Sequence, residues 1–442
     1  MGRRRAHAPL TILINGREVG RLEKAADGAV FFQYARDWVE WPQAFPISLS
    51  LPLQQAAYRG EAVNAVFDNL LPDSPAVRRQ VARTTGARGA DTYSLLQEIG
   101  RDCVGAMQFL PDGLEVDVSG AIQAEPIGED EIERLLANLA HAPLGVDPEE
   151  GFRISIAGAQ EKTALLFHDG RWKRPIGATP TTHILKPQLG RIPTASGEVD
   201  LTHSVDNEHY CLALMRAFGL ETAKTEIATF GERRVLVVER FDRAWRSDGR
   251  LLRLPQEDLC QALSIPSSRK YQDHGGPGMR NILDRLQEAD DPARDRLAFF
   301  SSQILFWLTG ATDGHAKNFS LFLRPGGRFE LTPFYDVLTA QPAFDAKQIP
   351  HNSFRLAMSA GASPHYRVDD VLGRHFIQSG KVAGLGPTAM RKVVDEIRAH
   401  AETAPDRALT DMPDDFHPEA YDAIKAVLPR RLKLLETAYD LL

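Results

Sequence analysis

The pattern of apolar and polar positions predicts that the chain begins with β structure. Residues 11–14 (TILI) and 17–22 (REVGRL) have the composition of short strands, and they flank the dipeptide Asn15-Gly16. Asn-Gly favours the positive φ angles that a two-residue turn between antiparallel strands requires. A β-hairpin is therefore expected in this part of the chain.

A helix is expected to follow the hairpin. Asp73 or Ser74 can cap its first turn, and Pro75 suits a helix start, where the N–H that proline lacks would be unpaired anyway. Later patterns favour two further elements, a helix over 94–100 and a strand over 104–109. We therefore expect residues 1–111 to form one mixed α/β unit.

A second, β-rich section is predicted after a polar connector. Residues 112–150 contain an amphipathic helix pattern at 129–140 and a turn-rich run at 141–148 that indicates a domain boundary. Residues 151–241 contain one helix pattern at 206–218 and strand patterns at 152–156, 163–167, 171–173, 182–186, 225–230 and 235–241. They are predicted to form the smaller of two lobes.

Residues 242–442 are predicted to form a mainly helical lobe. The most apolar window, at 297–308, is interrupted by polar residues and is too short to span a bilayer, so a buried helix is expected. The order of elements indicates an α+β protein of two lobes. A cleft between two lobes is a common place for a nucleotide.

The composition excludes several classes of protein. Hydrophobic residues make up 43% of the 442 positions and charged residues 25%, a globular mix that excludes disordered and fibrous chains. A net charge of -7 argues against a protein that coats nucleic acid or an anionic membrane by itself. Three widely separated cysteines fit a reducing compartment, and no apolar run of signal-peptide length is present, so we expect a cytoplasmic protein without membrane contact.

The strongest candidate chemistry lies in residues 311–322, where Asn318 follows Asp313 by five positions. Protein kinases use this spacing because the aspartate accepts the proton of the substrate hydroxyl and the asparagine binds Mg²⁺. The two residues could instead hold a local turn. The buried helix expected before them and the strand pattern at 319–323 favour the catalytic interpretation.

Three more charged residues occupy positions that a kinase would use. Asp336 follows a strand pattern and could bind Mg²⁺, although it could also cap a helix starting at residue 337. Lys186 ends a short strand, and Glu208 lies on the next helix, as in kinases whose lysine holds the ATP phosphates. An ordinary exposed lysine at a strand end is the commoner outcome.

Residues 155–162 (SIAGAQEK) are predicted to form a loop of small residues between two strands. Small side chains let backbone N–H groups reach phosphate oxygens, although a plain hairpin loop would have the same composition. Residues 239–241 end the last small-lobe strand, where a hinge between lobes would meet adenine. A zinc site at His183 or His315 is not expected, because neither has a second ligand three or four positions away.

Together these residues resemble the HipA family, serine/threonine kinases that act as the toxins of bacterial toxin–antitoxin pairs. The resemblance runs through nearly the whole chain, in residues 66–75, 98–102, 154–165, 183–186, 207–209, 238–243, 256–262, 312–318 and 333–336. It implies a two-lobed, protein-kinase-like α+β fold that binds ATP and Mg²⁺. The resemblance does not extend to the residues after about 387.

The resemblance also implies a role for each site residue. Asp313 would be the catalytic base, with Asn318 and Asp336 as the Mg²⁺ ligands. Lys186, supported by Glu208, would hold phosphates. The rest of the ATP site would comprise Ala157, Gly158, Ala159, Gln160, Glu161, Lys162, Glu239, Arg240, Phe241, His315, Lys317 and Tyr335. Ser155 would be the autophosphorylation site, and its modification would expel the phosphate loop (residues 157–162), because the added charge competes with the phosphates of ATP.

The partners implied by the resemblance are a HipB-like helix-turn-helix antitoxin, operator DNA reached through that antitoxin, and an aminoacyl-tRNA synthetase as substrate. The glutamyl enzyme is the most typical target, and its phosphorylation would arrest translation and growth and promote persistence. A small-molecule or lipid kinase and a non-catalytic co-repressor are the alternatives. Ser155 within the loop favours the protein kinase, and the complete set of Asp313, Asn318, Asp336 and Lys186 argues against the co-repressor.

Overall fold

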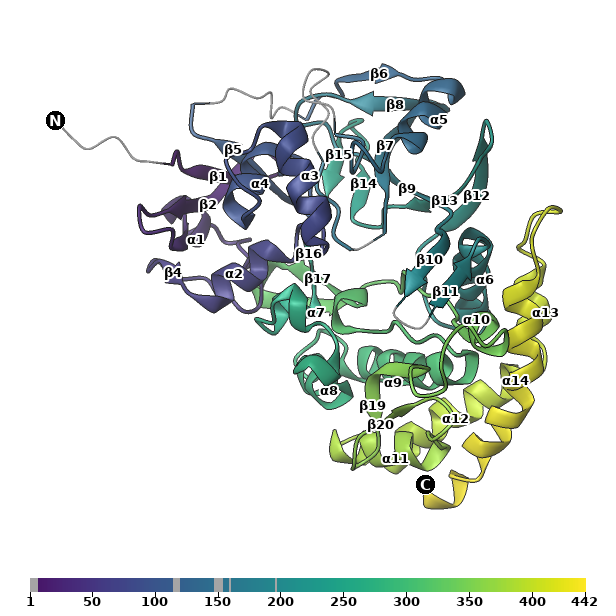
Figure 1. Cartoon of the computed structure of the whole chain (residues 1–442). Helices are drawn as coiled ribbons and strands as arrows, with labels where there is room; N and C mark the ends of the chain where they lie inside the picture. The colour runs from purple at the N-terminus through teal and green to yellow at the C-terminus, as the bar shows by residue number, and fades with distance from the viewer. Residues whose placement is uncertain (1–6, 114–119, 147–153, 159, 195–196) are drawn as a thin grey trace.

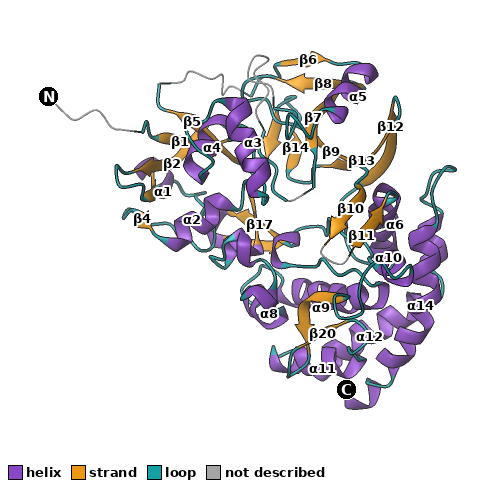
Figure 2. Cartoon of the chain, viewed as in Figure 1, coloured by secondary structure: helices purple, strands orange, loops and turns teal. Residues whose placement is uncertain are grey.

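The computed structural model describes residues 7–113, 120–146, 154–158, 160–194 and 197–442. Figure 1 shows an N-terminal unit beside a β-rich small lobe, with a helical large lobe below both. Figure 2 shows that the strands gather in the upper half and most of the helices in the lower half. No helix in the described ranges has an apolar stretch long enough to cross a bilayer.

The N-terminal unit is an antiparallel sheet covered by short helices. The strands lie in the order β4-β3-β2-β1-β5 and are β1 (Leu10–Ile14), β2 (Arg17–Lys24), β3 (Val30–Tyr34), β4 (Tyr58–Arg59) and β5 (Met107–Pro111). The helices are α1 (Arg36–Val39), α2 (Glu61–Asp68), α3 (Pro75–Thr85) and α4 (Thr92–Ile99). The predicted hairpin is confirmed, with Asn15 at φ 48° and Gly16 at φ 84° in its turn. Ser74 caps α3 by accepting a hydrogen bond from the N–H of Val77.

The predicted strand at 104–109 begins later, at Met107. Gly105 has a φ of +75°, which a strand residue does not adopt. A Cβ atom at this position would lie 2.7 Å from the carbonyl oxygen of Gln256 in the large lobe. The chain therefore turns at Gly105 to pass close to the large lobe before β5 starts.

The small lobe is built on an antiparallel sheet with the order β12-β13-β9-β7-β8-β6. Its strands are β6 (Ala124–Pro126), β7 (Thr163–His168), β8 (Arg171–Pro175), β9 (His183–Pro187), β12 (Thr225–Phe230) and β13 (Arg233–Glu239). Helices α5 (Glu129–Ala137) and α6 (Ser204–Ala217) pack against it. From the predicted connector, β6 is thus a strand of this sheet, and α5 packs against the sheet. A separate hairpin of β10 (Gly190–Thr194) and β11 (Gly197–Leu201), which the sequence pattern did not indicate, follows β9.

The prediction of a strand at 152–156 is wrong for residues 154–156, which belong to no sheet. Residues 152 and 153 lie outside the described ranges. Ile154, Ser155 and Ile156 are all buried. The N–H of Ser155 bonds to the carbonyl oxygen of Asp102 in the N-terminal unit. Burial against this unit, and not a sheet, explains the apolar pattern.

The large lobe is mainly helical, as predicted. Its helices are α7 (Leu259–Ala262), α8 (Met279–Leu286), α9 (Pro292–Thr309), α10 (Gln341–Asp345), α11 (Gly373–Val382), α12 (Pro387–Ala401), α13 (Ala404–Leu409) and α14 (Glu419–Glu436). Short strands interrupt them: β14 (Arg243–Trp245), β15 (Leu251–Arg253), β16 (Gln256–Asp258), β17 (Ser320–Arg324), β18 (Arg328–Leu331), β19 (Arg355–Ala360) and β20 (His365–Arg367). The buried helix expected at 297–308 is confirmed as α9, whose Phe299, Phe300 and Trp307 are fully buried.

Candidate active site

A cavity of about 530 Å³ lies between the small and large lobes. The sequence-predicted residues that line it are Ala157, Gly158, Gln160, Lys162, Lys186, Glu208, Glu239, Arg240, Phe241, Asp313, His315, Lys317, Asn318, Tyr335 and Asp336. Glu161 and Ser155 are not part of its wall, and Ala159 lies outside the described residues. The structure thus brings residues from six separate stretches of the chain to one place.

Lys186, on β9, joins two carboxylates at the centre of the cavity. Its Nζ atom lies 2.7 Å from Oε1 of Glu208, on α6, and 2.6 Å from Oδ1 of Asp336. Burial alone would lower the pKa of Lys186, but Asp336 and Glu208 outweigh it and raise that pKa. Burial would raise the pKa of Asp336, and Lys186 and Lys162 hold it well below its usual range. Both groups of the central pair are therefore charged at neutral pH.

Asp336 has an unusual backbone and does not cap a helix. Its φ of +58° lies in the left-handed region, which residues with a side chain rarely adopt outside turns and functional sites. The next helix, α10, begins only at Gln341, so the alternative of a helix starting at residue 337 is wrong. The strained backbone directs the carboxylate to Lys186 instead of to a helix N-terminus.

Asp313 and Asn318 lie on the loop that follows α9. The side-chain amide of Asn318 donates to the carbonyl oxygen of Asp313 at 2.9 Å, and the hydroxyl of Tyr271 donates to Oδ1 of Asp313. Because the NH₂ group of Asn318 donates to the loop backbone, the side-chain oxygen of Asn318 is the atom that can bind a cation. Asn318 and Asp336 thus supply the oxygen donors that a hard divalent cation prefers, so the residues fit such an ion.

The phosphate loop is held in the cavity by the N-terminal unit. The backbone N–H of Asp73 donates to the carbonyl oxygen of Gly158 at 3.1 Å. The ammonium of Lys162 donates to the carbonyl oxygen of Ala157 at 2.7 Å, and it lies so close to Gly158 that a Cβ there would be 2.5 Å from Nζ. Burial, followed by the charge of Lys186, lowers the pKa of Lys162 to about 8.

The hinge residues differ in how they face the cavity. Phe241 packs with Ile184, Val238 and Tyr335 in an apolar wall suited to a flat ring. Glu239 is exposed. The guanidinium of Arg240 is buried and forms ion pairs with Asp102 and Asp242, so the Arg240 side chain holds the hinge to the N-terminal unit.

The sequence analysis missed several site residues that line the cavity or contact its wall. Asp73 was expected only as a possible helix cap, yet its carboxylate lies 2.7 Å from the ammonium groups of both Lys270 and Lys317. Burial would raise the pKa of Asp73, but the two lysines lower it to about 2. Tyr271, which bonds to Asp313, was also missed, and so was Asp258, whose pKa burial raises to about 7. Asp73, within the stretch 66–75, and Asp258, within the stretch 256–262, carried a sequence signal, whereas Tyr271 carried none.

The sequence matches two protein-family descriptions. The HipA N-terminal domain matches residues 10–110, and the HipA-like C-terminal domain matches residues 154–404. A putative kinase, Y4mE of Sinorhizobium fredii, is 33% identical over 92% of this chain and 93% of its own length. The serine/threonine-protein kinase toxin HipA of Shewanella oneidensis is 29% identical over 75% of each chain.

A solved structure has the same fold. HipA of Shewanella oneidensis, in a complex with HipB and its operator DNA, superposes with a TM-score of 0.79. The match covers 98% of this chain and 99% of that one, at 23% sequence identity. The two-lobed α+β kinase-like architecture expected from the sequence is therefore confirmed.

Proposed function

The chain belongs to the HipA family of kinases, and we propose that it is a serine/threonine-protein kinase toxin that phosphorylates an aminoacyl-tRNA synthetase. We propose glutamyl-tRNA synthetase as the target, so that phosphorylation arrests translation and growth. The observation that carries the proposal is the meeting of Lys186, Asp336 and Asp313 in one cavity between the lobes. These are the charged groups that phosphoryl transfer requires.

In this proposal each residue acts on ATP or on the acceptor hydroxyl. Lys186 and Lys162 bind phosphate oxygens, and the apolar wall around Phe241 encloses adenine. Asp313 orients the acceptor hydroxyl and accepts its proton. Mg²⁺ held by Asn318 and Asp336 would offset the charge of the phosphates.

The exposure of Asp313 supports a protein as the acceptor. The Asp313 side chain is 56% exposed, whereas that of Lys186 is only 9% exposed. ATP phosphates would thus bind in the closed part of the cavity, and the acceptor would approach from solvent. A small-molecule kinase normally encloses most of its substrate's surface.

Ser155 is the proposed autophosphorylation site, and its surroundings fit a self-inactivating role. Its side chain is fully buried, and the hydroxyl donates to the carbonyl oxygen of Leu70 at 2.8 Å. A phosphate has no room there and carries nearly two negative charges, so the segment must leave its place against the N-terminal unit. Departure of Ser155 would pull the adjoining phosphate loop out of the cavity.

We also propose a helix-turn-helix antitoxin as partner, through which the chain reaches operator DNA as a co-repressor. Support comes from the Shewanella oneidensis HipA, which was solved with HipB and its operator DNA. The net charge of -7 fits contact with DNA through a partner better than direct coating of DNA.

The test is phosphorylation of a panel of purified aminoacyl-tRNA synthetases, followed by intact mass. The full-length protein is incubated with ATP and Mg²⁺ as wild type, as Asp313→Ala and as Asp284→Ala, which changes an exposed carboxylate on α8. We expect one synthetase to gain a phosphate, Asp313→Ala to lower the rate by about 10²–10⁴-fold and Asp284→Ala to have no effect. Undiminished transfer by Asp313→Ala would refute its role, and no labelled synthetase would refute the substrate class.

A further inference from the structure

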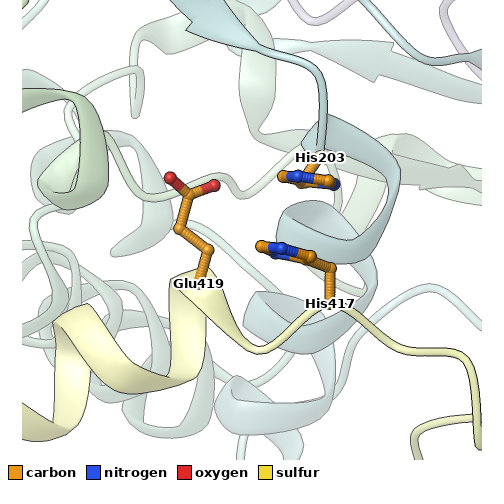
Figure 3. A group of neighbouring side chains, drawn as sticks. All are labelled: His203, His417 and Glu419. Carbon is orange, nitrogen blue, oxygen red and sulfur yellow. The ribbon is translucent and has the colours of Figure 1, made fainter.

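A compact group of possible metal ligands lies outside the ATP cavity. His203 precedes α6, and His417 and Glu419 lie where the chain enters α14. Their nitrogen and carboxylate ligand atoms all lie within 4.8 Å of one another. The two imidazole rings stack with centroids 3.4 Å apart and planes inclined by 5°, and Figure 3 shows the carboxylate of Glu419 beside both of them.

The backbone on both sides of this cluster is fixed by a buried charge. Asp206, in the first turn of α6, is 1% exposed, and its Oδ1 accepts a hydrogen bond from the backbone N–H of His417 at 3.1 Å. Arg234, on β13, binds Asp206 at 2.8 Å and also pairs with Asp415. The segment that carries His417 and Glu419 is therefore anchored to the start of α6 by contacts that do not involve the three ligand side chains.

In the described ranges, His203 also has the carboxylate of Asp200 as an electrostatic neighbour. Neither imidazole donates or accepts a hydrogen bond with a protein atom there, and the Glu419 carboxylate forms no ion pair there. The ring nitrogens and the carboxylate are thus available to a metal ion, and the anchored backbone holds them close together, as such a site requires. His417 and Glu419 are exposed, so an ion can reach them from solvent.

We propose that His203, His417 and Glu419 bind one divalent transition-metal ion of the Zn²⁺ class, with water completing the coordination. Zinc takes imidazole nitrogens and carboxylate oxygens in a four-coordinate arrangement. The stacked rings need only rotate about their side-chain bonds for both nitrogens to point at one ion. Mg²⁺ prefers an octahedron of oxygens, so this site differs from the one formed by Asn318 and Asp336.

Such an ion would join the C-terminal segment to the helix that carries Glu208. His203 directly precedes α6, and Glu208 lies within the first two turns of that helix. Since Glu208 bonds to Lys186 in the ATP cavity, metal binding would stabilise the helix that positions the phosphate-binding lysine. The proposal concerns metal binding alone and does not depend on the kinase's substrate.

The test measures metal in the full-length protein without ATP. Chelator-treated wild type, His417→Ala and Glu419→Gln are dialysed against Zn²⁺ and, separately, against Mg²⁺, and bound metal is quantified. His141→Ala serves as the control because His141 is an exposed histidine away from the cluster. We expect one Zn²⁺ per wild-type and control chain. Removal of an outer-shell partner typically lowers metal affinity by about 10–100-fold. Both ligand variants remove a direct ligand, so their Zn²⁺ affinity should fall by more than this.

A second readout keeps the test independent of folding. Zn²⁺ should raise the melting temperature of wild type and of His141→Ala but not of the ligand variants, whose melting temperatures without metal should equal that of wild type. His203→Gln and Glu419→Gln preserve side-chain size if an alanine variant fails to fold. The proposal is overturned if wild type binds no stoichiometric Zn²⁺, if the ligand variants bind it as tightly, or if Mg²⁺ binds equally well.

Discussion

At the scale of single residues, the charges of the ATP cavity balance one another. Lys186 and Lys162 contribute two positive charges, and Glu208 and Asp336 contribute two carboxylates, all lining the same cavity. Lys186 is bonded to both carboxylates, so its charge is already compensated. These four side chains therefore leave most of the negative charge of a polyphosphate uncompensated. This balance fits the divalent cation that kinases bind together with their nucleotide.

The lowered pKa of Lys162 predicts that ATP affinity depends on pH. The pKa of this lysine is about 8, so the free protein loses the charge above that pH, whereas bound phosphates favour the charged form. ATP binding should therefore require proton uptake and weaken as the pH rises from about 7 to about 9.5. Calorimetric titration with ATP in buffers of different ionisation enthalpy measures both effects.

Two lysine variants test this prediction, one within the cavity and one, the control, on the exposed surface. Lys162→Gln should bind ATP more weakly at neutral pH and show a flat pH profile, whereas Lys392→Gln, which alters an exposed lysine of α12, should follow wild type. A pH dependence that persists unchanged in Lys162→Gln would assign the effect to another group.

The site residues that the sequence predicted are those that belong to short patterns. Asp313 and Asn318 are five positions apart, and one loop places both in the cavity. The contact of Asp73 with Lys317 joins the N-terminal unit to the large lobe, and neither residue predicts the other. Such a pair is created by packing between units, which a single sequence does not encode in any local spacing.

At the scale of elements, the loop before α3 takes part in the cavity between the lobes. Asp73 lies between the last turn of α2 and the cap of α3, and it contacts Gly158 of the phosphate loop through its backbone. Its carboxylate holds Lys317, which lies between Asp313 and Asn318 in the sequence. One loop of the N-terminal unit thus contacts both the segment with Gly158 and the loop that carries Asp313 and Asn318.

Asp73→Asn should destabilise the protein in a pH-dependent way. The folded pKa of about 2 lies below the ordinary 3.8, so ionised Asp73 adds stability above pH 3.8 that is lost as the pH falls through 2. The shift corresponds to about 2 kcal/mol at neutral pH. Urea denaturation should show the variant less stable than wild type at about pH 7, with a difference that shrinks toward about pH 3.

The matched control for Asp73 is Asp284→Asn, which changes an exposed aspartate of α8 and should leave stability within about 0.5 kcal/mol of wild type. A difference between Asp73→Asn and wild type that stayed constant with pH would show that the two lysines do not stabilise the ionised carboxylate.

The elements with a clear period or turn signal were predictable, and those fixed by contacts between units were not. The hairpin at Asn15-Gly16 and the helix starting at Pro75 have local signals and formed as expected. Residues 154–156 have the apolar pattern of a strand because they are buried between units. Burial and strand pairing leave the same pattern in a sequence, so only the structure separates them.

At the scale of the whole molecule, one buried carboxylate links the N-terminal unit to the hinge. Asp102 forms ion pairs with Arg240, Arg243 and Arg253 at 2.9–3.2 Å. Burial, with the charge of Arg240, lowers the pKa of Arg243 to about 10. The main hydrophobic core is also continuous through all three parts of the molecule, from Leu10 to Ala438. The N-terminal unit is therefore a structural part of the kinase.

Asp102→Asn should lower the free energy of unfolding of the whole molecule. The change keeps the side-chain shape but leaves three buried guanidinium groups with Asp242 as the one remaining carboxylate of this network among the described residues. Breaking a buried ion pair by removing one partner costs about 3–5 kcal/mol. Because Asp102 also binds the segment with Ser155 through its backbone, the loss should reach the phosphate loop and lower ATP affinity. Denaturant unfolding followed by tryptophan fluorescence and by loss of bound nucleotide should give coincident, lowered midpoints.

The control that separates coupling from a general loss of charge is Asp112→Asn, directly after the last strand of the N-terminal unit. Asp112 is exposed and lies 3.7 Å from Arg21, so its replacement should change stability by less than about 0.5 kcal/mol. Asp102→Asn could instead unfold the N-terminal unit in an early, separate step while nucleotide stayed bound to the two lobes. That result would show that the stability of the unit is independent of the lobes. Coincident transitions in the variant would establish that the nucleotide cavity and the N-terminal unit unfold cooperatively. The physical reason is that one buried carboxylate, Asp102, binds both the hinge and the segment that leads into the phosphate loop.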